Sequence, residues 1–357
     1  MVEQEVAEHE EDLGPASLIS ALMGILELLT PSHHHQLWRA DPGPLSRLYT
    51  VLSEVMARPP FPAEWMSLRL AVAVTVSTSL QQAGNCLHYL TFDKQLWMAY
   101  FQLSVIYITS PILQFEQMKK HGNLCVGLDS IGDPRLPIAT HMVSTWQSCP
   151  EQIQLVPSLV GPLLEVTLIP QREIRQTILP LLIYMMEAEQ KEKGNFRQME
   201  TELIDKLDIL ISENKGDEEY RQIFNSLMMD LAQHLDPHWR ESGTVFVRSV
   251  CQLLERLLDY RDVLQGEENR NKRMSCTVNL LKFYSDDNNC QEMFIRYIYK
   301  LHDQHVQVNN NVEAAFTLHL HANQLTWSTR MLHADLQFPT QQEWQRKEHL
   351  YEQIANL

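Results

Sequence analysis

Apolar side chains recur at three- and four-residue steps along most of this chain. Between residues 243 and 264 one such stripe consists of Val247, Val250, Cys251, Leu254, Leu257 and Leu258. This spacing places the side chains on one face of an α-helix, whereas a strand would alternate at every second residue. The chain also has only 12 glycines and 17 prolines among its 357 residues. The pattern predicts an all-α protein.

Prolines and glycines divide the first third into predicted helices over residues 15–30, 44–57, 63–82, 93–109 and 111–120. Pro31 and the triplet His33-His34-His35 are predicted to form a loop, as are residues 121–137. Gly84-Asn85 is predicted to end the third helix. The centre of that helix, residues 68–76, is apolar nearly all round and is predicted to be interior.

A repeat pattern is clearest from Pro157 to Leu182. An apolar helix is followed by a short turn at Pro170 and a second helix that begins near the pair Ile174-Arg175. This order resembles a HEAT-type repeat, in which each helix pair has an apolar face that only the next pair covers. The sequence therefore predicts an α-solenoid of HEAT- or armadillo-like helix pairs.

Further helices are predicted over residues 196–212, 217–235 and 243–264, and a charged loop over residues 266–271. The last third is predicted to form helical hairpins similar to tetratricopeptide repeats, with a turn at Asn309-Asn310-Asn311. The two apolar faces of the hairpin consist of Phe294, Tyr297, Ile298 and Leu301, and of Ala315, Leu318, Ala322 and Leu325. A final helix is predicted to start near Pro339 and to be still running at Leu357, which suggests a truncated chain.

The net charge of −16 disfavours nucleic acid and anionic membrane as direct partners. Six acidic residues and no Lys or Arg fall within residues 1–13. We expect this segment to be a disordered, solvated tail, or alternatively a docking segment for a basic partner. The predicted domains are thus the tail 1–13, helical repeats over 14–265 and a separate helical unit over 266–357.

Six cysteines occur without CxxC spacing, which is typical of reduced thiols in the cytosol. We see no secretory leader at the N-terminus. The longest apolar stretch, Leu96–Thr109, is shorter than the ~20 residues that a membrane-spanning helix needs.

Three histidine groups are candidate metal ligands. His33-His34-His35 lacks accompanying ligands, and its adjacent side chains point in different directions. His302 and His305 lie three apart on a predicted helix, so both could face one ion, but no further ligand is near. His319 and His321 lie two apart and face different ways. Loop, packing or surface roles are favoured for all three groups.

Other reactive patterns are weak as well. Cys276 and Cys290 are better explained as structural thiols than as reactive ones. The cluster Arg270, Lys272 and Arg273 is either a contact for an acidic partner or, as we favour, part of a mixed-charge surface. The carboxylate pairs Glu218-Glu219 and Asp286-Asp287 fit solvated helix edges and caps. No GxGxxG, GxxxxGK[ST], GxSxG or HExxH motif occurs, so no catalytic, cofactor-binding or metal-binding residue is assigned.

Residues 269–327 read NRNKRMSCTVNLLKFYSDDNNCQEMFIRYIYKLHDQHVQVNNNVEAAFTLHLHANQLTW. This run closely resembles the opening of the catalytic region of the dedicator-of-cytokinesis (DOCK) family. Leu253–Arg261 is similar to the segment leading into that region, and Leu163–Pro170 to the preceding helical repeats. Gln342–Glu348 looks most like the subgroup that contains the neuronally expressed members. The family's usual Asn-Tyr-Thr-Glu-Ala-Ala run is replaced at residues 310–315 by Asn-Asn-Val-Glu-Ala-Ala.

The resemblance implies the scaffold portion of a guanine-nucleotide exchange factor for Rac-type, or alternatively Rap-type, small GTPases. It implies a cytoplasmic parent protein with ELMO-type adaptors as partners and recruitment to the plasma membrane through parts not present here. Because the family's catalytic region has three lobes and this chain reaches only part of the first, we expect the chain to be inactive alone. The alternative is a self-sufficient helical-repeat adaptor that binds another protein.

Overall fold

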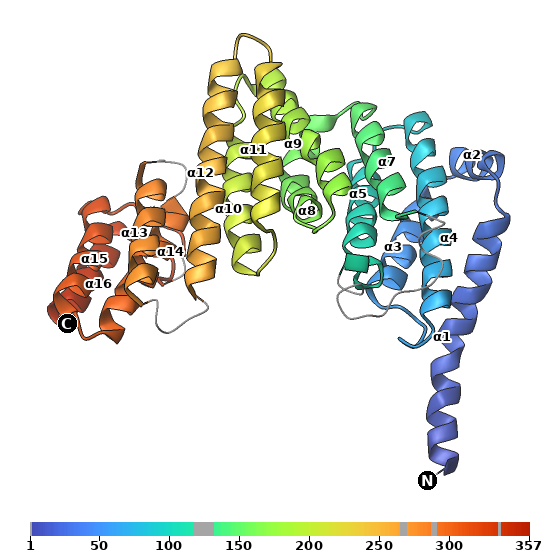
Figure 1. Cartoon of the computed structure of the whole chain (residues 1–357), viewed down its shortest axis with the longest axis horizontal. Coiled ribbons are helices and arrows are strands. Elements are labelled where there is room, and N and C mark those ends of the chain that lie inside the picture. Colours follow the sequence, from blue (N-terminus) through green and yellow to red (C-terminus); the bar gives the residue numbers. More distant parts are fainter. Residues whose placement is uncertain (1, 117–131, 265–269, 287–290, 335–336) are drawn as a thin grey trace. The chain divides into compact units, whose positions relative to one another are not determined.

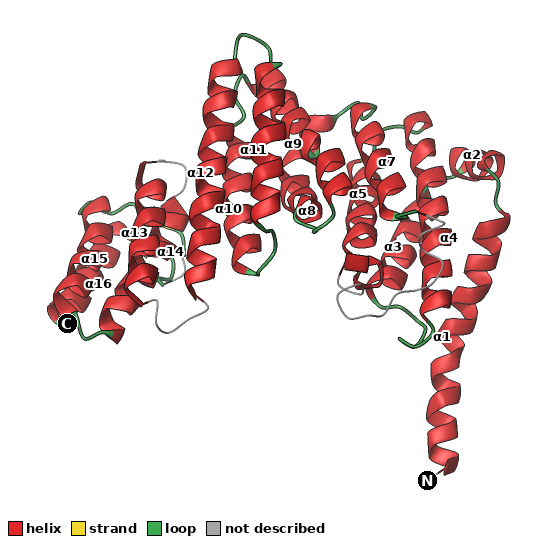
Figure 2. Cartoon of the chain, viewed as in Figure 1, coloured by secondary structure: helices red, strands yellow, loops and turns green. Residues whose placement is uncertain are grey.

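The computed structural model describes residues 2–116, 132–264, 270–286, 291–334 and 337–357. Almost all of them form α-helices that follow one another in chain order (Figures 1 and 2). The predicted all-α helical repeat array is therefore confirmed. Within the described ranges the strand structure is confined to one short antiparallel pair, β1 (Met331–Leu332) and β2 (Gln341–Gln342).

The helices of the first two thirds are α1 (Val2–Leu28), α2 (Pro31–Ala40), α3 (Gly43–Ala57), α4 (Met66–Cys86), α5 (Lys94–Thr109), α7 (Arg135–Gln147), α8 (Val156–Thr167), α9 (Arg172–Lys193), α10 (Arg197–Ser212), α11 (Glu218–Gln233) and α12 (Arg240–Leu264). Single 3₁₀ turns join some of them, at η1 (Leu87–Tyr89), η2 (Pro111–Leu113) and η4 (Gln152–Gln154). The last third contains α13 (Arg270–Asp286), α14 (Gln291–Gln307), α15 (Asn311–Gln324) and α16 (Glu343–Ala355).

The chain divides into two compact units. The first unit comprises residues 1–203 and 215–243, and the second comprises residues 204–214 and 244–357. Helices α10 and α12 therefore each contribute to both. The predicted boundary near residue 265 stays a prediction, because residues 265–269 lie outside the described part of the chain.

In the first unit each helix packs on neighbours that are close in the sequence. Contacts link α4 to α1 and α2, α5 to α3, α7 and α8, and α9 to α7, α8 and α11. Large aromatic side chains fill the space between them, and Trp97, Tyr100 and Trp146 are fully buried. Burying one large apolar side chain is worth roughly 1.5–3 kcal/mol, so this packing is the main source of helix stability.

In the second unit α14 packs on α13 and α15, and α15 packs on α16. The predicted apolar face of α14 is buried at all four of its positions. On α15, Leu318 and Ala322 are buried, as is Leu325 just after the helix, whereas Ala315 is only partly covered. Leu318, Ala322 and Leu325 belong to a core that also includes Ile295, Tyr299, Phe338 and Leu350.

The start of the chain differs from expectation in two ways. Helix α1 begins at Val2, so the predicted start near Pro15 is wrong; Glu and Ala are good helix formers, and acidic residues suit a helix N-terminus. The existence of a separate disordered tail over residues 1–13 stays a prediction.

The His33–His35 triplet lies in helix α2 and not in a loop. Pro31 occupies its first turn, where proline is tolerated, and Thr30 and His33 cap each other's backbone N–H groups.

Helix α4 continues through Gly84 to Cys86, so the predicted stop at Gly84-Asn85 is wrong. A Cβ atom at Gly84 would lie 2.6 Å from a carbon of the His141 ring and 2.7 Å from a carbon of the Tyr100 ring. The glycine therefore serves close helix packing and does not end the helix. The centre of α4 is also less interior than predicted, because Leu68 and Val74 are exposed.

The predicted helix over residues 111–120 is described only to Glu116, where the 3₁₀ turn η2 replaces its first part. Of the predicted loop 121–137, residues 121–131 lie outside the described ranges, and α7 begins at Arg135. The last helix, α16, ends at Ala355 with Asn356 as its cap, so the prediction that it is still running at Leu357 is wrong.

Within the described residues no single helix is both long and apolar enough to cross a membrane. The bent pair Ala16–Leu28 and Pro31–Arg39 reaches the required length and composition only when its two helices are taken together.

Candidate functional site

The strongest polar features of this fold are charged side chains buried between helices. Charged groups are almost never fully buried unless they are paired and hydrogen-bonded. Arg135 and Arg175 in the first unit and Asp208 in the second have no exposed side-chain surface. These three residues are therefore the candidate sites, together with a half-buried histidine between α4, α5 and α7.

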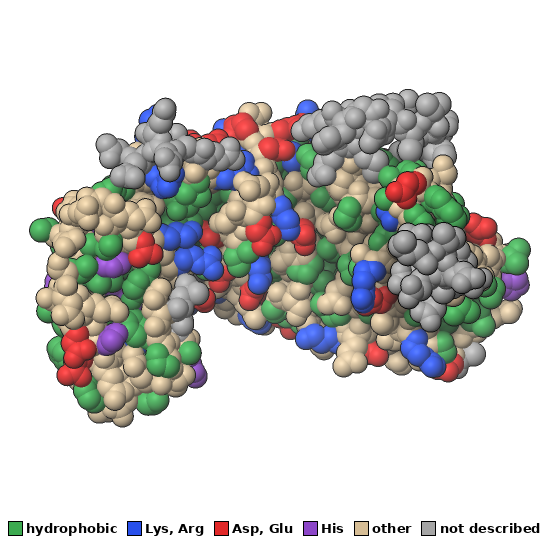
Figure 3. Space-filling view, turned by 90° about the horizontal axis from the view of Figure 1, so that it is seen from below, with side chains coloured by type: hydrophobic (Ala, Val, Ile, Leu, Met, Phe, Trp, Pro, Cys, Tyr) green, Lys and Arg blue, Asp and Glu red, His purple; other side chains and the backbone are tan. Residues whose placement is uncertain are grey.

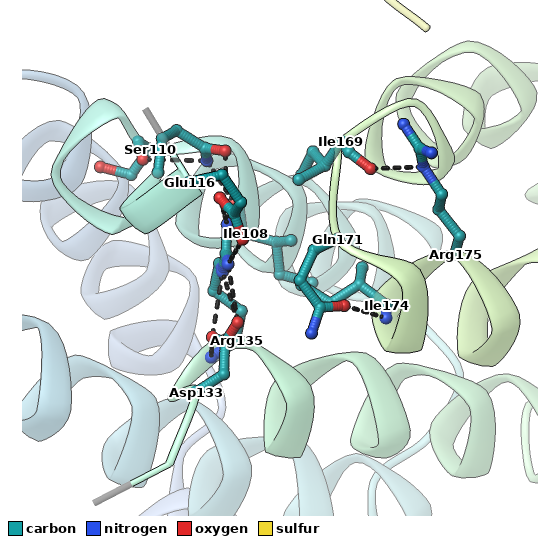
Figure 4. Close-up of polar contacts among 10 residues, drawn as sticks. Ile108, Ser110, Glu116, Asp133, Arg135, Ile169, Gln171, Ile174 and Arg175 are labelled. Atoms are coloured by element: carbon teal, nitrogen blue, oxygen red, sulfur yellow. Dashed lines mark hydrogen bonds and ion pairs between the residues drawn. The ribbon is translucent and has the colours of Figure 1, made fainter. Parts of the chain in front are cut away.

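Arg135 lies at the start of α7 and contacts residues on both sides of segment 117–131 (Figure 4). Its guanidinium donates to Asp133 at 2.6 to 3.1 Å, to Glu116 at 2.5 and 3.3 Å, and to Gln114 at 3.3 Å. The amide of Gln114 in turn donates to the carbonyls of Ile108 and Ser110. The five N–H groups of the guanidinium lie in one plane, an arrangement that only arginine provides, and they thus all face acceptors.

The two carboxylates stabilise the charged form of Arg135. Burial by itself would lower the pKa of Arg135, but hydrogen bonds and charge attraction from Asp133 and Glu116 outweigh burial and raise it. The guanidinium also lies over the Phe115 ring, 5.3 Å from its centroid. Arg135 is therefore a fixed cation that ties α7 to the residues after η2.

Arg175 performs a similar task on α9. Its guanidinium donates to the Ile169 carbonyl at 2.6 Å and the Leu168 carbonyl at 3.3 Å, just beyond the end of α8 (Figure 4). It also forms a two-pronged pair with Asp217, at 2.9 and 2.8 Å. The last carbonyls of a helix lack hydrogen-bond donors within the helix. Arg175 therefore provides donors for the end of α8.

Asp217 links this contact to the next helix. Its side chain caps α11 by accepting from the backbone N–H of Tyr220 at 2.7 Å. The Tyr220 ring lies under Arg175, 5.6 Å away, and its hydroxyl lies 3.1 Å from that of Thr167 at the end of α8. One buried arginine thereby joins α8, α9 and α11.

In the second unit the buried charge is negative. Asp208 on α10 accepts from the hydroxyls of Tyr284 at 2.9 Å and Tyr297 at 2.7 Å, and from Arg296 at 3.2 Å. The two tyrosine rings are stacked with centroids 5.3 Å apart. Lys300 lies 4.3 Å from the centroid of the Tyr297 ring, and burial lowers the pKa of its ammonium group. Burial and the nearby Asp208 charge raise the pKa of Tyr297, so its hydroxyl keeps its proton and donates.

Replacing Asp208 by asparagine should lower the free energy of unfolding by about 1–3 kcal/mol, because charge-assisted hydrogen bonds from two tyrosines and an arginine become neutral ones. Urea unfolding followed by circular dichroism measures this loss. Asp303→Asn, at an exposed position of α14 in the same unit, is the matched control and should be neutral. Equal stabilities of the two variants would show that the carboxylate charge does not hold this cluster.

The half-buried histidine is His141 on α7. Its Nε2–H donates to Asn85 Oδ1 at 3.0 Å, so its Nδ1 accepts from the Tyr100 hydroxyl at 2.5 Å. In the neutral ring one nitrogen donates and the other accepts, which matches both contacts. Burial, with a smaller contribution from nearby His88, lowers the pKa of His141 to about 4.

This lowered pKa predicts acid sensitivity. The unfolded chain takes up a proton at His141 near its ordinary pKa of about 6.5, whereas the folded chain resists protonation until about 4. The contribution of neutral His141 to the free energy of unfolding is therefore complete above the pKa of the unfolded chain and is lost as the pH falls toward 4. At pH 5 the loss is at most about 2 kcal/mol. Urea unfolding at pH 7.5 and pH 5 should show this loss in the native chain and a smaller loss in His141→Gln. A loss of equal size in both would rule out His141 as its source.

Most of the histidines considered as metal ligands contact other groups in the structure. His34 is buried and accepts from the Trp38 indole N–H at 3.0 Å. His302 contacts the Ala314 carbonyl at 3.2 Å, and His305 lies one helical turn further along α14. His321 is buried beside Tyr299, while His319 contacts Tyr351 on α16. No group of three or more His, Cys, Asp or Glu side chains among the described residues is placed to hold a metal ion.

The remaining candidates are also dispersed. Burial raises the pKa of the Cys276 thiol, as expected for a structural cysteine, whereas Cys290 lies outside the described residues. Lys272 is exposed, and Arg273 donates to the Leu264 carbonyl, whereas the side chain of Arg270 is outside the described part. Figure 3 shows basic and acidic side chains interspersed over the face that it draws.

The carboxylate pairs have different outcomes. Glu218 pairs with Arg221 in the first turn of α11, which lowers the pKa of its carboxyl. Glu219 lies 3.8 Å from Arg175, and both glutamates occupy the helix edge that the sequence predicted. The pair Asp286-Asp287 cannot be placed, since the side chain of Asp286 and all of Asp287 lie outside the described residues.

Sequence reasoning noticed Arg175 as part of the Ile174-Arg175 pair but assigned it no role, and it missed Arg135 and Asp208. A signal existed for Asp208, because it shares a helix face with the buried Ile204 and Ile211. A charge on an apolar stripe implies a buried partner. For Arg135 no comparable signal exists, because two of its partners, Gln114 and Glu116, lie on the far side of a long intervening segment.

A family model described as "Dedicator of cytokinesis (DOCK) TPR region" matches residues 17–227. The chain belongs to the DOCK family. The matched residues contain both buried arginines and Asp208. They also lie within the stretch for which the sequence predicted HEAT- or armadillo-like helix pairs, which the DOCK model names a TPR region.

Individual DOCK proteins are similar over a longer range. Dedicator of cytokinesis protein 3 of Homo sapiens is 43% identical over 324 residues, which is 87% of this chain and 16% of that protein. Dedicator of cytokinesis protein 4 of Homo sapiens is 40% identical over 344 residues, or 93% of this chain and 17% of that protein. The chain thus spans about a sixth of the length of these DOCK relatives. Assignment to the neuronally expressed subgroup stays a prediction.

Proposed function

We propose that this chain is the helical scaffold portion of a DOCK-type guanine-nucleotide exchange factor for Rac-type small GTPases. The observation that carries the proposal is the match of residues 17–227 to the DOCK family, extended by 43% identity to dedicator of cytokinesis protein 3. Rap-type GTPases are the alternative substrates. ELMO-type adaptors as partners, a cytoplasmic location and recruitment to the plasma membrane belong to the same proposal.

The physical character of the buried charges supports a scaffold role. Arg135, Arg175 and Asp208 each hold two or more helices or their ends together and are enclosed by their partners. A repeat array gains rigidity from such contacts because each helix otherwise touches only its near neighbours. An exchange factor needs a rigid support of this kind, since it distorts a bound GTPase through precisely placed surfaces.

The activity itself is proposed to reside in parts of the parent protein outside this chain. The isolated chain should therefore leave the release of a fluorescent GDP analogue from Rac unchanged. Inserted into dedicator of cytokinesis protein 3 of Homo sapiens in place of the aligned segment, it should support release. Acceleration by the isolated chain at micromolar concentration would contradict the scaffold proposal, and a folded but inactive chimera would contradict the exchange-factor role.

A further inference from the structure

Tyr89 in the first unit differs from the other tyrosines of this chain in its accessibility. The sequence contains 11 tyrosines, and all of them lie within the described ranges. Eight of them are buried, whereas Tyr184 and Tyr351 are partly exposed. Tyr89 is 67% exposed. The chain thus presents one tyrosine that an enzyme can reach without disturbing the packing of the helices.

The residues after Tyr89 form an extended segment between two helices. Tyr89 ends the 3₁₀ turn η1, and α5 begins at Lys94. Leu90 has φ −96° and ψ 155°, and Asp93 has φ −127° and ψ 112°, which are both extended conformations. In the described part of the chain, the backbone N–H groups of residues 91–93 donate no hydrogen bond. An enzyme that binds its substrate as an added strand can therefore pair with this segment without opening a helix.

The Tyr89 ring lies against helix α2. It contacts His35 edge-on, with ring centroids 5.1 Å apart. Arg39 follows His35 by four residues and therefore shares its face of α2. Arg39 is exposed and forms no ion pair with any described residue, and α2 contains no acidic side chain. The face of α2 beside Tyr89 thus offers an imidazole and an unpaired guanidinium.

A phosphate on the Tyr89 oxygen would suit these surroundings. A phosphoryl group adds about −1.5 to −2 charges and three strong acceptor oxygens, and arginine can bind two of those oxygens at once. Asp93 is the acidic residue nearest to Tyr89 in the sequence. Its side chain is engaged as the cap of α5, where it accepts from the Gln95 backbone N–H at 2.8 Å. Attraction to α2 should therefore outweigh repulsion by Asp93.

We propose that Tyr89 is phosphorylated by a tyrosine kinase and that the phosphate then fastens η1 to α2 through His35 and Arg39. In the transfer, the Tyr89 oxygen forms a bond to the γ-phosphorus of ATP while the bond from that phosphorus to the bridging oxygen breaks. ADP leaves with the electron pair, and the phenol proton passes to the base of the kinase. This site is independent of the exchange-factor proposal, because it rests only on α2, η1 and the segment before α5.

The test of the modification uses the full chain, ATP and the catalytic domain of a broad-specificity tyrosine kinase. Peptide mass spectrometry locates the phosphate and measures its rate of incorporation. We expect Tyr89 to be modified at least about tenfold faster than Tyr184 or Tyr351, because α9 and α16 must open locally before a kinase can bind them as strands. Tyr89→Phe keeps the ring against His35 and should remove nearly all incorporation. Equal rates at Tyr184, or unchanged incorporation in Tyr89→Phe, would overturn the proposal.

Hydrogen exchange tests the contact with α2. In the native chain, phosphorylation should slow amide exchange in α2 at least about threefold, since charge-assisted hydrogen bonds hold the helix in place. Arg39→Gln should be phosphorylated at the native rate but show little slowing. Arg47→Gln, at an exposed position of α3, is the matched control and should retain the slowing. No slowing in the phosphorylated native chain, or equal slowing in Arg39→Gln, would overturn the role of α2.

Discussion

Replacing Arg135 by methionine should destabilise the first unit by about 3–5 kcal/mol, which is the cost of breaking a buried ion pair by removing one partner. Methionine fills a similar volume but donates no hydrogen bonds. The carboxylates of Glu116 and Asp133, 25% and 18% exposed, would then face each other without a cation. Gln114 would also lose a donor. Urea unfolding followed by circular dichroism and tryptophan fluorescence measures the change.

Two further variants test the cause of this loss. Arg58→Met removes an exposed pair with Glu54 on α3 and should change the free energy of unfolding by no more than about 0.5 kcal/mol. Adding Glu116→Gln to Arg135→Met should recover part of the loss, since it removes one of the two repelling charges. A double variant less stable than Arg135→Met would show that repulsion between the carboxylates is not the main cost.

Arg175→Met should have an effect of similar size, about 3–5 kcal/mol, for a different reason. Asp217 is 42% exposed and can be hydrated when its partner is lost. The carbonyls of Leu168 and Ile169 belong to buried residues and would lose their side-chain donor, and Tyr220 would lose the cation above its ring. The loss should therefore arise mainly from the uncapped end of α8. The same urea unfolding experiment measures it.

Arg172 provides the matched control for this prediction. It lies three residues earlier on α9 and is exposed, so Arg172→Met should be nearly neutral. Asp217→Asn retains a side chain that can cap α11, and it should cost little when added to Arg175→Met. If Asp217→Asn alone were as destabilising as Arg175→Met, the ion pair and not the helix end would carry the stability.

Local patterns predicted much of this fold. The bounds of α3, α5, α8, α10 and α11, and the start of α9, follow within a few residues from apolar spacing and from prolines, glycines and caps near their ends. These signals are contained in neighbouring residues, so they need no knowledge of the tertiary structure. The same holds for the paired helices after Pro157, whose uncovered faces implied a stacked array.

Tertiary contacts decided the features that the sequence did not reveal. Gly84 reads as a helix end, but the approach of Tyr100 and His141 makes it an interior position of α4. The partners of Asp208 on α14 are 88 and 89 residues further along the chain. No spacing rule connects such distant residues, and without an alignment no covariation can reveal them. A buried charge such as Asp208 could thus be recognised from its position on an apolar helix face, but its distant partners could not be predicted.

The chimera tests most directly whether this chain serves as the scaffold of a DOCK-type exchange factor. Dedicator of cytokinesis protein 3 of Homo sapiens, with its aligned segment replaced by this chain, is assayed for release of a fluorescent GDP analogue from Rac. We expect release within a fewfold of the parent rate, and a marked loss of activity on heating when Arg135→Met is added. A chimera that is folded, with a melting temperature like the parent's, but releases no GDP would contradict it.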